Sequence, residues 1–207
     1  MSPMPLPDPS AAAAFVNSVH ADRVREWLPE IPEAVAKAFL ANRRLQPALA
    51  ERIARHYEIG VEMPEVAPDD RIILDLPHRS FAALINAAGI VWHARQLRTI
   101  IDRHELMAVL TGIDEAAYRV AMSHGDLAPN RMPLPKEREA LTSACLWRDG
   151  CRCFFAWAET LPQVHRDRIW LRFPPDFTVE PLALLFRVPA QDIIRKISKE
   201  LMSHDGG

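Results

Sequence analysis

The middle of the chain repeats its hydrophobic residues at intervals of three and four positions. After Pro77, the residues Phe81, Leu84, Ile85 and Ala88 keep this spacing. Positions three and four apart lie on one face of an α-helix. The pattern therefore predicts a helix here, and the same spacing continues through Leu97, Ile100, Ile101, Leu106, Val109, Leu110 and Ile113.

The same period returns in the C-terminal half. A long helix is predicted over about 136–161, with apolar positions at Trp147, Cys151, Phe154, Ala158 and Leu161. Gly150 weakens this helix by about 1 kcal/mol relative to alanine, which allows a bend at that point. A shorter helix is predicted over 114–124 with Asp114 as its cap, and two more over 179–186 and 190–202.

Prolines divide the N-terminal part into short pieces. We expect residues 1–9 to form a flexible, Pro-rich N-terminus, and three predicted helices follow between residues 10 and 60. Residues 61–71 have the composition of a linker because they contain Pro64, Pro68 and the acidic pair Asp69–Asp70. We therefore expect an N-terminal helical subdomain over 10–60 and a main helical domain over 72–203, unless the two pack together as one domain.

The apolar run Ile72–Leu76 is short and begins with two β-branched residues, so it favours an extended segment. Too few similar segments exist to build a sheet around it. The predicted fold is a compact, mainly α, multi-helix arrangement with at most this minor β element.

Composition narrows the function classes. The formal net charge of −2 gives no electrostatic reason to expect binding to nucleic acid or to an anionic membrane. The three cysteines, at positions 145, 151 and 153, are an odd and clustered set, whereas a disulfide framework normally uses an even, dispersed one. With no signal-like segment and no apolar run of about 18 residues, we expect a cytoplasmic protein that does not insert into a membrane.

The sequence offers little for catalysis. Cys151 and Cys153 could supply thiolates to a metal or to thiol chemistry, but structural zinc needs four ligands and a second pair is missing. His93 and His104 lie eleven residues apart, too far for one metal ion on a continuous helix. No glycine-rich phosphate loop or nucleophile motif occurs. We predict no enzyme activity, no cofactor and no metal site, with a thiol or metal enzyme as an alternative.

A second alternative is a transcription regulator. Residues 179–197 have the pattern of a helix–turn–helix, with Ala183, Val188 and Ile194 in the buried positions. Three cations, Arg195, Lys196 and Lys199, would then face phosphate groups. Against this interpretation, Asp192 and Glu200 lie on the same helix, and the chain as a whole is not basic.

Basic residues also collect in the middle of the chain, at Arg95, Arg98 and Arg103. Such a run is usually a solvated helix face. The alternative is a docking face for an acidic partner protein, where charge sets orientation and association rate. We take these three arginines as candidate partner-binding residues, while the five tryptophans are expected mostly in the core.

Three pieces of the block 74–122 carry a family resemblance. They read Leu-Asp-Leu-Pro-His-Arg, Ala-Gly-Ile-Val-Trp-His-Ala-Arg-Gln-Leu-Arg and Glu-Ala-Ala-Tyr-Arg-Val-Ala-Met. The block resembles the SctK/YscK family of bacterial type III secretion, and the resemblance extends more loosely over most of the chain. These pieces are helix-surface patterns without catalytic signatures.

The resemblance implies a non-enzymatic, cytoplasmic adaptor of the injectisome sorting platform. Members of that family link the cytoplasmic domain of the inner-membrane ring protein (SctD type) to the pod protein (SctQ type). The resemblance implies no cofactor and no nucleic acid, and it places the protein peripherally at the cytoplasmic face of the inner membrane. It identifies no individual contact residues.

Overall fold

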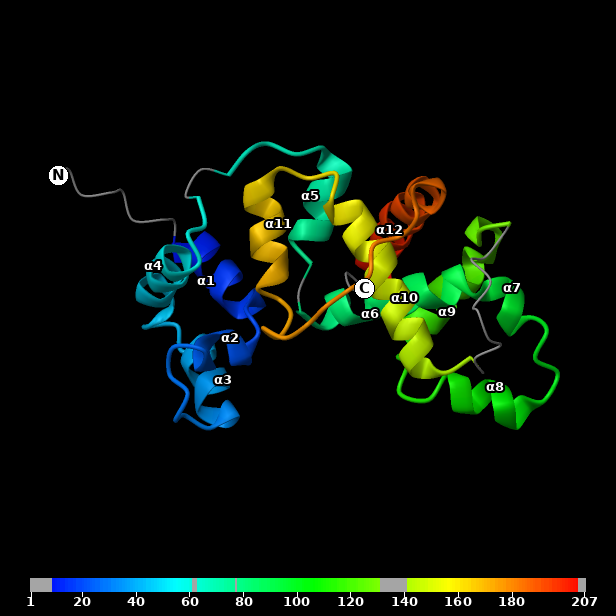
Figure 1. Ribbon diagram of the computed structural model, residues 1–207, viewed down its shortest axis with the longest axis horizontal. Coiled ribbons are helices and arrows are strands. Elements are labelled where there is room, and N and C mark those ends of the chain that lie inside the picture. Colours follow the sequence, from blue (N-terminus) through cyan, green and yellow to red (C-terminus); the bar gives the residue numbers. More distant parts are fainter. Residues whose placement is uncertain (1–8, 61–62, 77, 131–140, 205–207) are drawn as a thin grey trace. The chain divides into compact units, whose positions relative to one another are not determined.

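The computed structural model describes residues 9–60, 63–76, 78–130 and 141–204. Within these residues the chain forms twelve α-helices and one short 3-10 helix, and no strand (Figure 1). The predicted mainly α fold is therefore confirmed. Residues 1–8, most of the Pro-rich terminus, and 131–140, where the long helix was predicted to begin, lie outside the described part.

The chain divides into two units that are interleaved in sequence. One unit combines Met1–Val66 with Leu161–Thr178, and the other combines Ala67–Thr160 with Val179–Gly207. The second unit is the larger. The segment Leu161–Thr178 thus belongs with the N-terminal helices. Its position in the sequence does not suggest this, because the segments on both sides of it belong to the larger unit.

The larger unit is built around two helices, α6 (His78–Trp92) and α10 (Ser143–Ala158). They pack extensively on each other and on α12 (Leu184–His204). α10 is buried on almost every side from Asp149 onward, since Phe154, Phe155 and Trp157 are all buried. The unit is completed by α5 (Pro68–Leu74), α7 (Ala94–Leu97), α8 (Arg103–Val109), α9 (Glu115–Ser123) and the 3-10 helix η1 (Gly125–Leu127).

Two glycines permit the close crossing of α6 and α10. A Cβ atom on Gly89 would lie 2.7 Å from the Leu146 carbonyl carbon and closer still to its oxygen. A Cβ atom on Gly150 would lie 3.0 Å from the Ile85 carbonyl carbon, again with the oxygen nearer. α10 runs as one helix through Gly150. The glycine therefore serves the helix crossing, because any side chain there would push the two backbones apart.

The segment expected to be extended is helical. Residues Ile72 and Ile73 lie within α5, which begins with Pro68 and carries Asp69 and Asp70 in its first turn. Proline at the first helical position and acidic residues near the positive end of the helix dipole both favour a helix here. The prediction of an extended segment is wrong because these signals outweigh the β-branched preference of two isoleucines.

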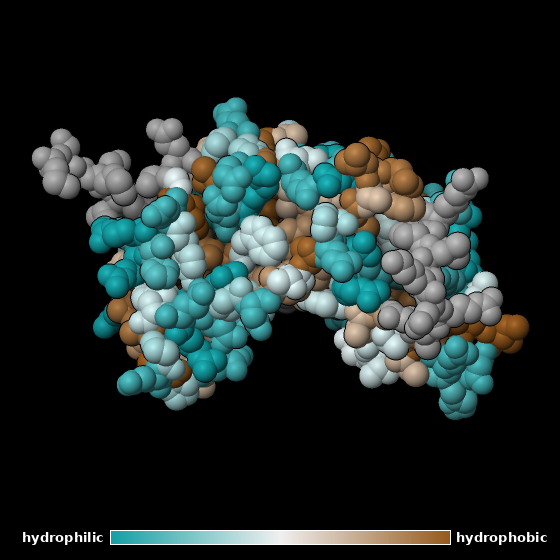
Figure 2. Space-filling model, in the orientation of Figure 1, coloured by the Kyte–Doolittle hydropathy of each residue, from teal (hydrophilic) through white to brown (hydrophobic). Residues whose placement is uncertain are grey.

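α12 buries one face along most of its length. Its buried face carries Phe186, Ala190, Ile193, Ile194, Ile197 and Leu201, which repeat at three and four residues. The opposite face is hydrophobic over the first turns, where Figure 2 shows a surface patch of apolar side chains. Farther along, the exposed residues are charged, with Asp192 and Lys196 in register. No helix in the described part of the chain, α12 included, is both long and apolar enough to cross a bilayer.

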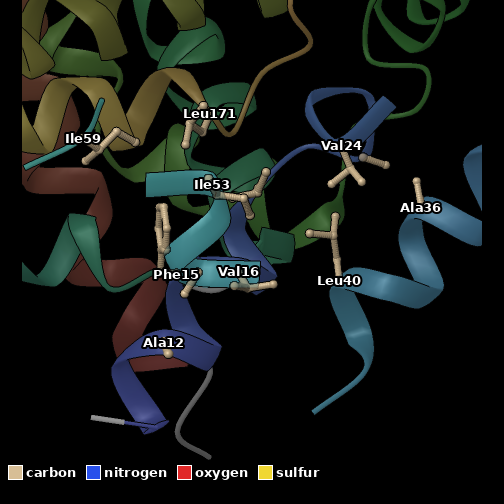
Figure 3. Close-up of a cluster of buried hydrophobic side chains, with 12 residues drawn as sticks. Ala12, Phe15, Val16, Val24, Ala36, Leu40, Ile53, Ile59 and Leu171 are labelled. Atoms are coloured by element: carbon tan, nitrogen blue, oxygen red, sulfur yellow. The ribbon is translucent and has the colours of Figure 1, made fainter. Parts of the chain in front are cut away.

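The smaller unit contains α1 (Pro9–Ser18), α2 (Ala21–Arg25), α3 (Glu33–Ala41), α4 (Gln46–His56) and α11 (Gln163–Trp170). These helices are short, so each contributes only a few residues to a shared core. Figure 3 shows Phe15 and Val16 of α1 beside Ile53 of α4, with Leu171 near Ile53. In the same core, Val24 of α2 faces Leu40 of α3.

Arg23 joins the two sequence segments of the smaller unit. Its guanidinium donates to the carbonyl oxygens of Phe173 (3.0 Å), Trp170 (3.2 Å) and Pro174 (3.3 Å). The backbone N–H of His20 adds a 2.7 Å bond to the Leu171 carbonyl. The Trp170 and Leu171 carbonyls lie at the end of α11, where a helix leaves its last carbonyls without donors of its own, and the Phe173 and Pro174 carbonyls follow just after the helix.

Candidate protein-interaction surface

The first turns of α12 expose three large aliphatic side chains. Leu184 is 78% exposed, Leu185 71% and Val188 62%, and we refer to these three residues as the α12 patch. They follow the i, i+1, i+4 spacing of one helix face, opposite buried Phe186. Single exposed aliphatic residues are ordinary on protein surfaces, whereas a contiguous group of them is a candidate site for a partner.

Polar contacts fix the start of α12 against the end of α10. The Arg187 guanidinium donates to the Leu182 carbonyl at 3.2 Å and pairs with Glu159 at 2.6 Å. Farther along, the Gln191 side chain donates to the Ala156 carbonyl at 3.1 Å. The α12 patch is therefore held on a fixed backbone before any partner binds, which reduces the conformational entropy lost on binding.

The predicted helix–turn–helix is not formed. Residues 179–183 are not helical, and α12 is one helix through Pro189. Of the three residues expected in buried positions only Ile194 is buried, while Ala183 and Val188 are exposed.

Two cations of this segment form ion pairs with carboxylates of α5. Arg195 is paired with Asp70 at 2.9 Å, and Lys199 with Asp69 at 2.8 Å. Two of the three cations expected to face phosphates therefore connect α12 to α5. The alternative of a helix–turn–helix regulator loses its structural basis.

The three predicted partner-binding arginines are exposed on α7 and α8. Arg95 lies within α7, Arg98 at its C-terminal cap, and Arg103 is the first residue of α8. The Arg95 guanidinium donates to the side-chain oxygen of Asn130. Among the described residues, none of the three arginines pairs with a carboxylate. Arg95 and Arg98 are one turn apart, whereas Arg103 belongs to the following helix, and their role in binding stays a prediction.

The segment between α7 and α8 differs from the expected pattern. The hydrophobic spacing placed Ile101 on the same apolar stripe as Leu97, but Ile101 is 98% exposed while Leu97 is buried. The helix is interrupted here, because α7 ends at Leu97 and α8 begins only at Arg103. Residues in the interruption no longer follow helical periodicity, so the spacing that predicted burial of Ile101 does not apply to it.

Two of the three cysteines are buried away from solvent. Cys151 and Cys153 are buried and all three cysteines are free, with Cys145 half-buried. Burial raises the pKa of the Cys151 thiol to about 12 and raises the pKa of Cys153 as well. A reactive cysteine needs a lowered pKa and access to solvent. Within the described residues there is also no group of histidine, cysteine and acidic side chains that could hold a metal ion.

A buried ionic cluster connects α10 to the residues that follow α6. Asp149 of α10 lies 2.8 Å from a ring nitrogen of His93 and accepts from Arg152 at 3.1 Å, and the other ring nitrogen of His93 bonds Gln96 at 2.6 Å. Burial alone would raise the pKa of Asp149, but these partners outweigh it and lower the pKa to about 2. Because this pKa lies below the unfolded value, Asp149 stabilises the fold above about pH 4, and the contribution is lost as the pH falls toward 2.

A second buried carboxylate joins three helices. Asp70 of α5 accepts from the indole N–H of Trp157 on α10 at 2.7 Å and from Arg195 on α12 at 2.9 Å. Buried charges of this kind are stable only when they are paired and hydrogen-bonded. Sequence reasoning missed both clusters, because the members that come from different helices lie 56 to 125 residues apart and share no motif.

Comparison with known proteins finds a distant similarity. Over 159 residues, which are 76% of this chain and 71% of the relative, the chain is 26% identical to the nodulation protein NolU of Rhizobium fredii. The same figures hold for NolU of Sinorhizobium fredii. No family model matches the chain, and no solved structure matches it either. Membership of the SctK/YscK family therefore stays a prediction.

Proposed function

We propose that this protein is a non-enzymatic adaptor of a type III secretion sorting platform, linking an SctD-type ring protein to an SctQ-type pod protein. The observation that carries the proposal is the α12 patch. It combines three exposed aliphatic side chains with a backbone that is already fixed by Arg187 and Gln191. Such a patch binds a protein surface through apolar burial, and it needs no reacting group.

Two sequence comparisons support the proposed link to type III secretion. The block 74–122 resembles the SctK/YscK family, and the wider chain is similar to a nodulation protein, NolU. The α12 patch supports binding to a protein, while the identity of the two partners and the location at the cytoplasmic face of the inner membrane come from the resemblance.

The framework of the larger unit suits a linking role. An adaptor holds two assemblies at a fixed distance and orientation, so its binding surfaces must lie on one rigid body. The buried cluster around Asp149 connects α10 to His93 at the start of α7, and the cluster around Asp70 connects α5, α10 and α12. Buried polar networks with satisfied partners favour one packing arrangement over others.

The test is co-purification with the two proposed partners. The variant Leu184→Ser/Leu185→Ser/Val188→Ser removes the α12 patch while leaving the buried face of α12 intact. Each aliphatic side chain contributes about 1–2 kcal/mol when a partner buries it, and only part of this total appears as affinity. We therefore expect binding to one partner to weaken at least tenfold, measured by biolayer interferometry.

A matched control is available in the smaller unit. Leu28, Val35 and Leu45 are exposed aliphatic residues of the same types, each between 37% and 39% exposed. Serine at these three positions should leave the affinity for that same partner unchanged. If neither the ring protein nor the pod protein binds the wild-type chain, the proposed function is wrong. If both bind the patch variant as tightly as the wild type, the α12 patch is not the interface.

A further inference from the structure

The exposed side of α12 continues from the α12 patch into two charged residues. Residues at intervals of four positions form one ridge along a helix. On α12 the exposed members of this ridge are Leu184, Val188, Asp192 and Lys196. From the first to the last, the ridge rises about 18 Å, at about 1.5 Å per residue. Its first half is aliphatic, and its second half carries a carboxylate followed by an ammonium group.

The two charges of this ridge are free, unlike the other charges of α12. The cations at positions 187, 195 and 199 pair with carboxylates of the larger unit, and Glu200 accepts from the Ser123 hydroxyl at 3.2 Å. Asp192 and Lys196 have no ion pair and no side-chain hydrogen bond within the described part of the chain. They do not pair with each other, although opposite charges four residues apart on a helix are well placed to do so. Both are therefore available to a partner that lies along the ridge.

A second acceptor lies near Asp192 because of Pro189. Proline has no N–H group, so the carbonyl of Leu185, four residues earlier, lacks its usual helical donor. Side chains of a helix lean toward its N-terminus, which carries the Asp192 carboxylate over the turn that contains Pro189. The carboxylate and the carbonyl thus both lie around this turn. A cationic side chain of a partner can donate to both of them.

A helix suits this ridge better than an extended segment does. The backbone groups of α12 bond within the helix, apart from its ends and the position of Pro189. An extended segment laid on α12 would lose water from its own N–H and C=O groups without finding a row of backbone partners. A helix satisfies its backbone groups internally, and it can place the ridge of α12 in a groove between its own side chains.

We infer that the exposed side of α12 binds a helix of a partner protein that carries aliphatic residues opposite the α12 patch, a cation opposite Asp192 and a carboxylate opposite Lys196. The inference rests on the proposed adaptor function and deepens it by naming the chemistry of the partner. The order aliphatic, negative, positive along α12 is the same in only one direction, so the complementary helix binds in one orientation.

The test uses the full chain with the pod protein and with the cytoplasmic domain of the ring protein. Two single variants, Asp192→Lys and Lys196→Asp, are compared with the exchange variant Asp192→Lys/Lys196→Asp, which keeps the net charge of the wild type. The control is Glu30→Lys, which reverses an exposed carboxylate of the smaller unit that has no ion pair among the described residues. Affinities are measured by biolayer interferometry at about 50 and about 300 mM NaCl, which differ in how strongly they screen charge. Urea unfolding checks that each variant is folded.

We expect each single variant to weaken binding by about fivefold or more, for the same partner whose binding requires the α12 patch. The exchange variant should bind that partner more weakly than either single variant, because it places like charges opposite each other at both positions. Higher salt should reduce the difference between the exchange variant and the wild type. Glu30→Lys should bind as the wild type does. Hydrogen exchange on the partner should show protection of a helix that contains Lys or Arg.

An exchange variant that binds as tightly as the wild type would overturn the inference, because binding would then depend on net charge or on the aliphatic residues alone. Protection of an extended segment of the partner would also overturn it. So would a dimer of this chain, or binding to phosphatidylserine vesicles, that is lost in the exchange variant. In these cases the adaptor function stands if one partner still requires the α12 patch. If neither partner binds the wild type, the adaptor function itself fails.

Discussion

The close crossing of α6 and α10 predicts that the substitution Gly89→Ala lowers the free energy of unfolding. The added Cβ atom would lie 2.7 Å from the Leu146 carbonyl carbon, whereas carbon atoms in contact are ordinarily about 3.5–4.0 Å apart. The two helices must therefore separate by about 1 Å. The obstacle is a backbone carbonyl inside a helix, which cannot rotate away as a side chain would.

The magnitude follows from two opposing effects. Overpacking of this kind costs about 3 kcal/mol, at the upper end of its usual range. Alanine is better than glycine within a helix by about 1 kcal/mol, which offsets part of that cost. We expect a net loss of about 2 kcal/mol. With a urea dependence of about 2 kcal/mol per molar, the unfolding midpoint should fall by about 1 M.

The assay is urea unfolding followed by circular dichroism, with hydrogen exchange to locate the loss in α6 and α10. Gly125→Ala is the control in the same unit, because its Cβ atom would meet chiefly the guanidinium end of exposed Arg98, at 2.6 Å, which can move into solvent. Gly150→Ala should behave like Gly89→Ala. A Gly89→Ala protein that unfolds at the wild-type urea concentration or above would refute the close crossing.

Three further predictions concern the buried groups. Asp149→Asn should lower the free energy of unfolding at pH 7 by about 3 kcal/mol, because it leaves Arg152 and the His93 ring without the carboxylate. The variant should also lose less stability than the wild type between about pH 4 and 2. Urea unfolding midpoints measured across this pH range check both results. Trp157→Phe should cost about 2 kcal/mol in a thermal unfolding experiment, since Asp70 loses a donor at 2.7 Å. Cys145 should react with Ellman's reagent well before Cys151, which should react only on unfolding; equal rates would contradict the burial of Cys151.

The sequence alone determined the helical class and many of the helices. The spacing of Phe81, Leu84 and Ile85 gives α6 its buried face, and all three are buried. The predicted cap of α9 is also observed, with the Asp114 carboxylate accepting from the Ala117 N–H at 3.4 Å. Such features are local, because helix periodicity and capping depend on residues only a few positions apart. They can therefore be inferred without the tertiary structure.

Other local features were missed because their signals are weak or conflict. α11 buries only His165 and Ile169, too few positions to give a periodic pattern. Pro189 suggested two helices where α12 is continuous. In that helix, packing of Ile193 and its neighbours against α6 and α10 outweighs the loss of one backbone hydrogen bond.

Only the tertiary structure decided which distant residues meet. Asp149 and His93 are 56 residues apart, and Asp70 and Arg195 are 125 apart, so no spacing in the sequence relates them. The same holds for exposure, since Ile101 fits an apolar stripe in the sequence and is nevertheless almost fully exposed. A hydrophobic pattern states which residues favour burial, whereas the packing of whole helices decides which of them are buried and which remain available to a partner.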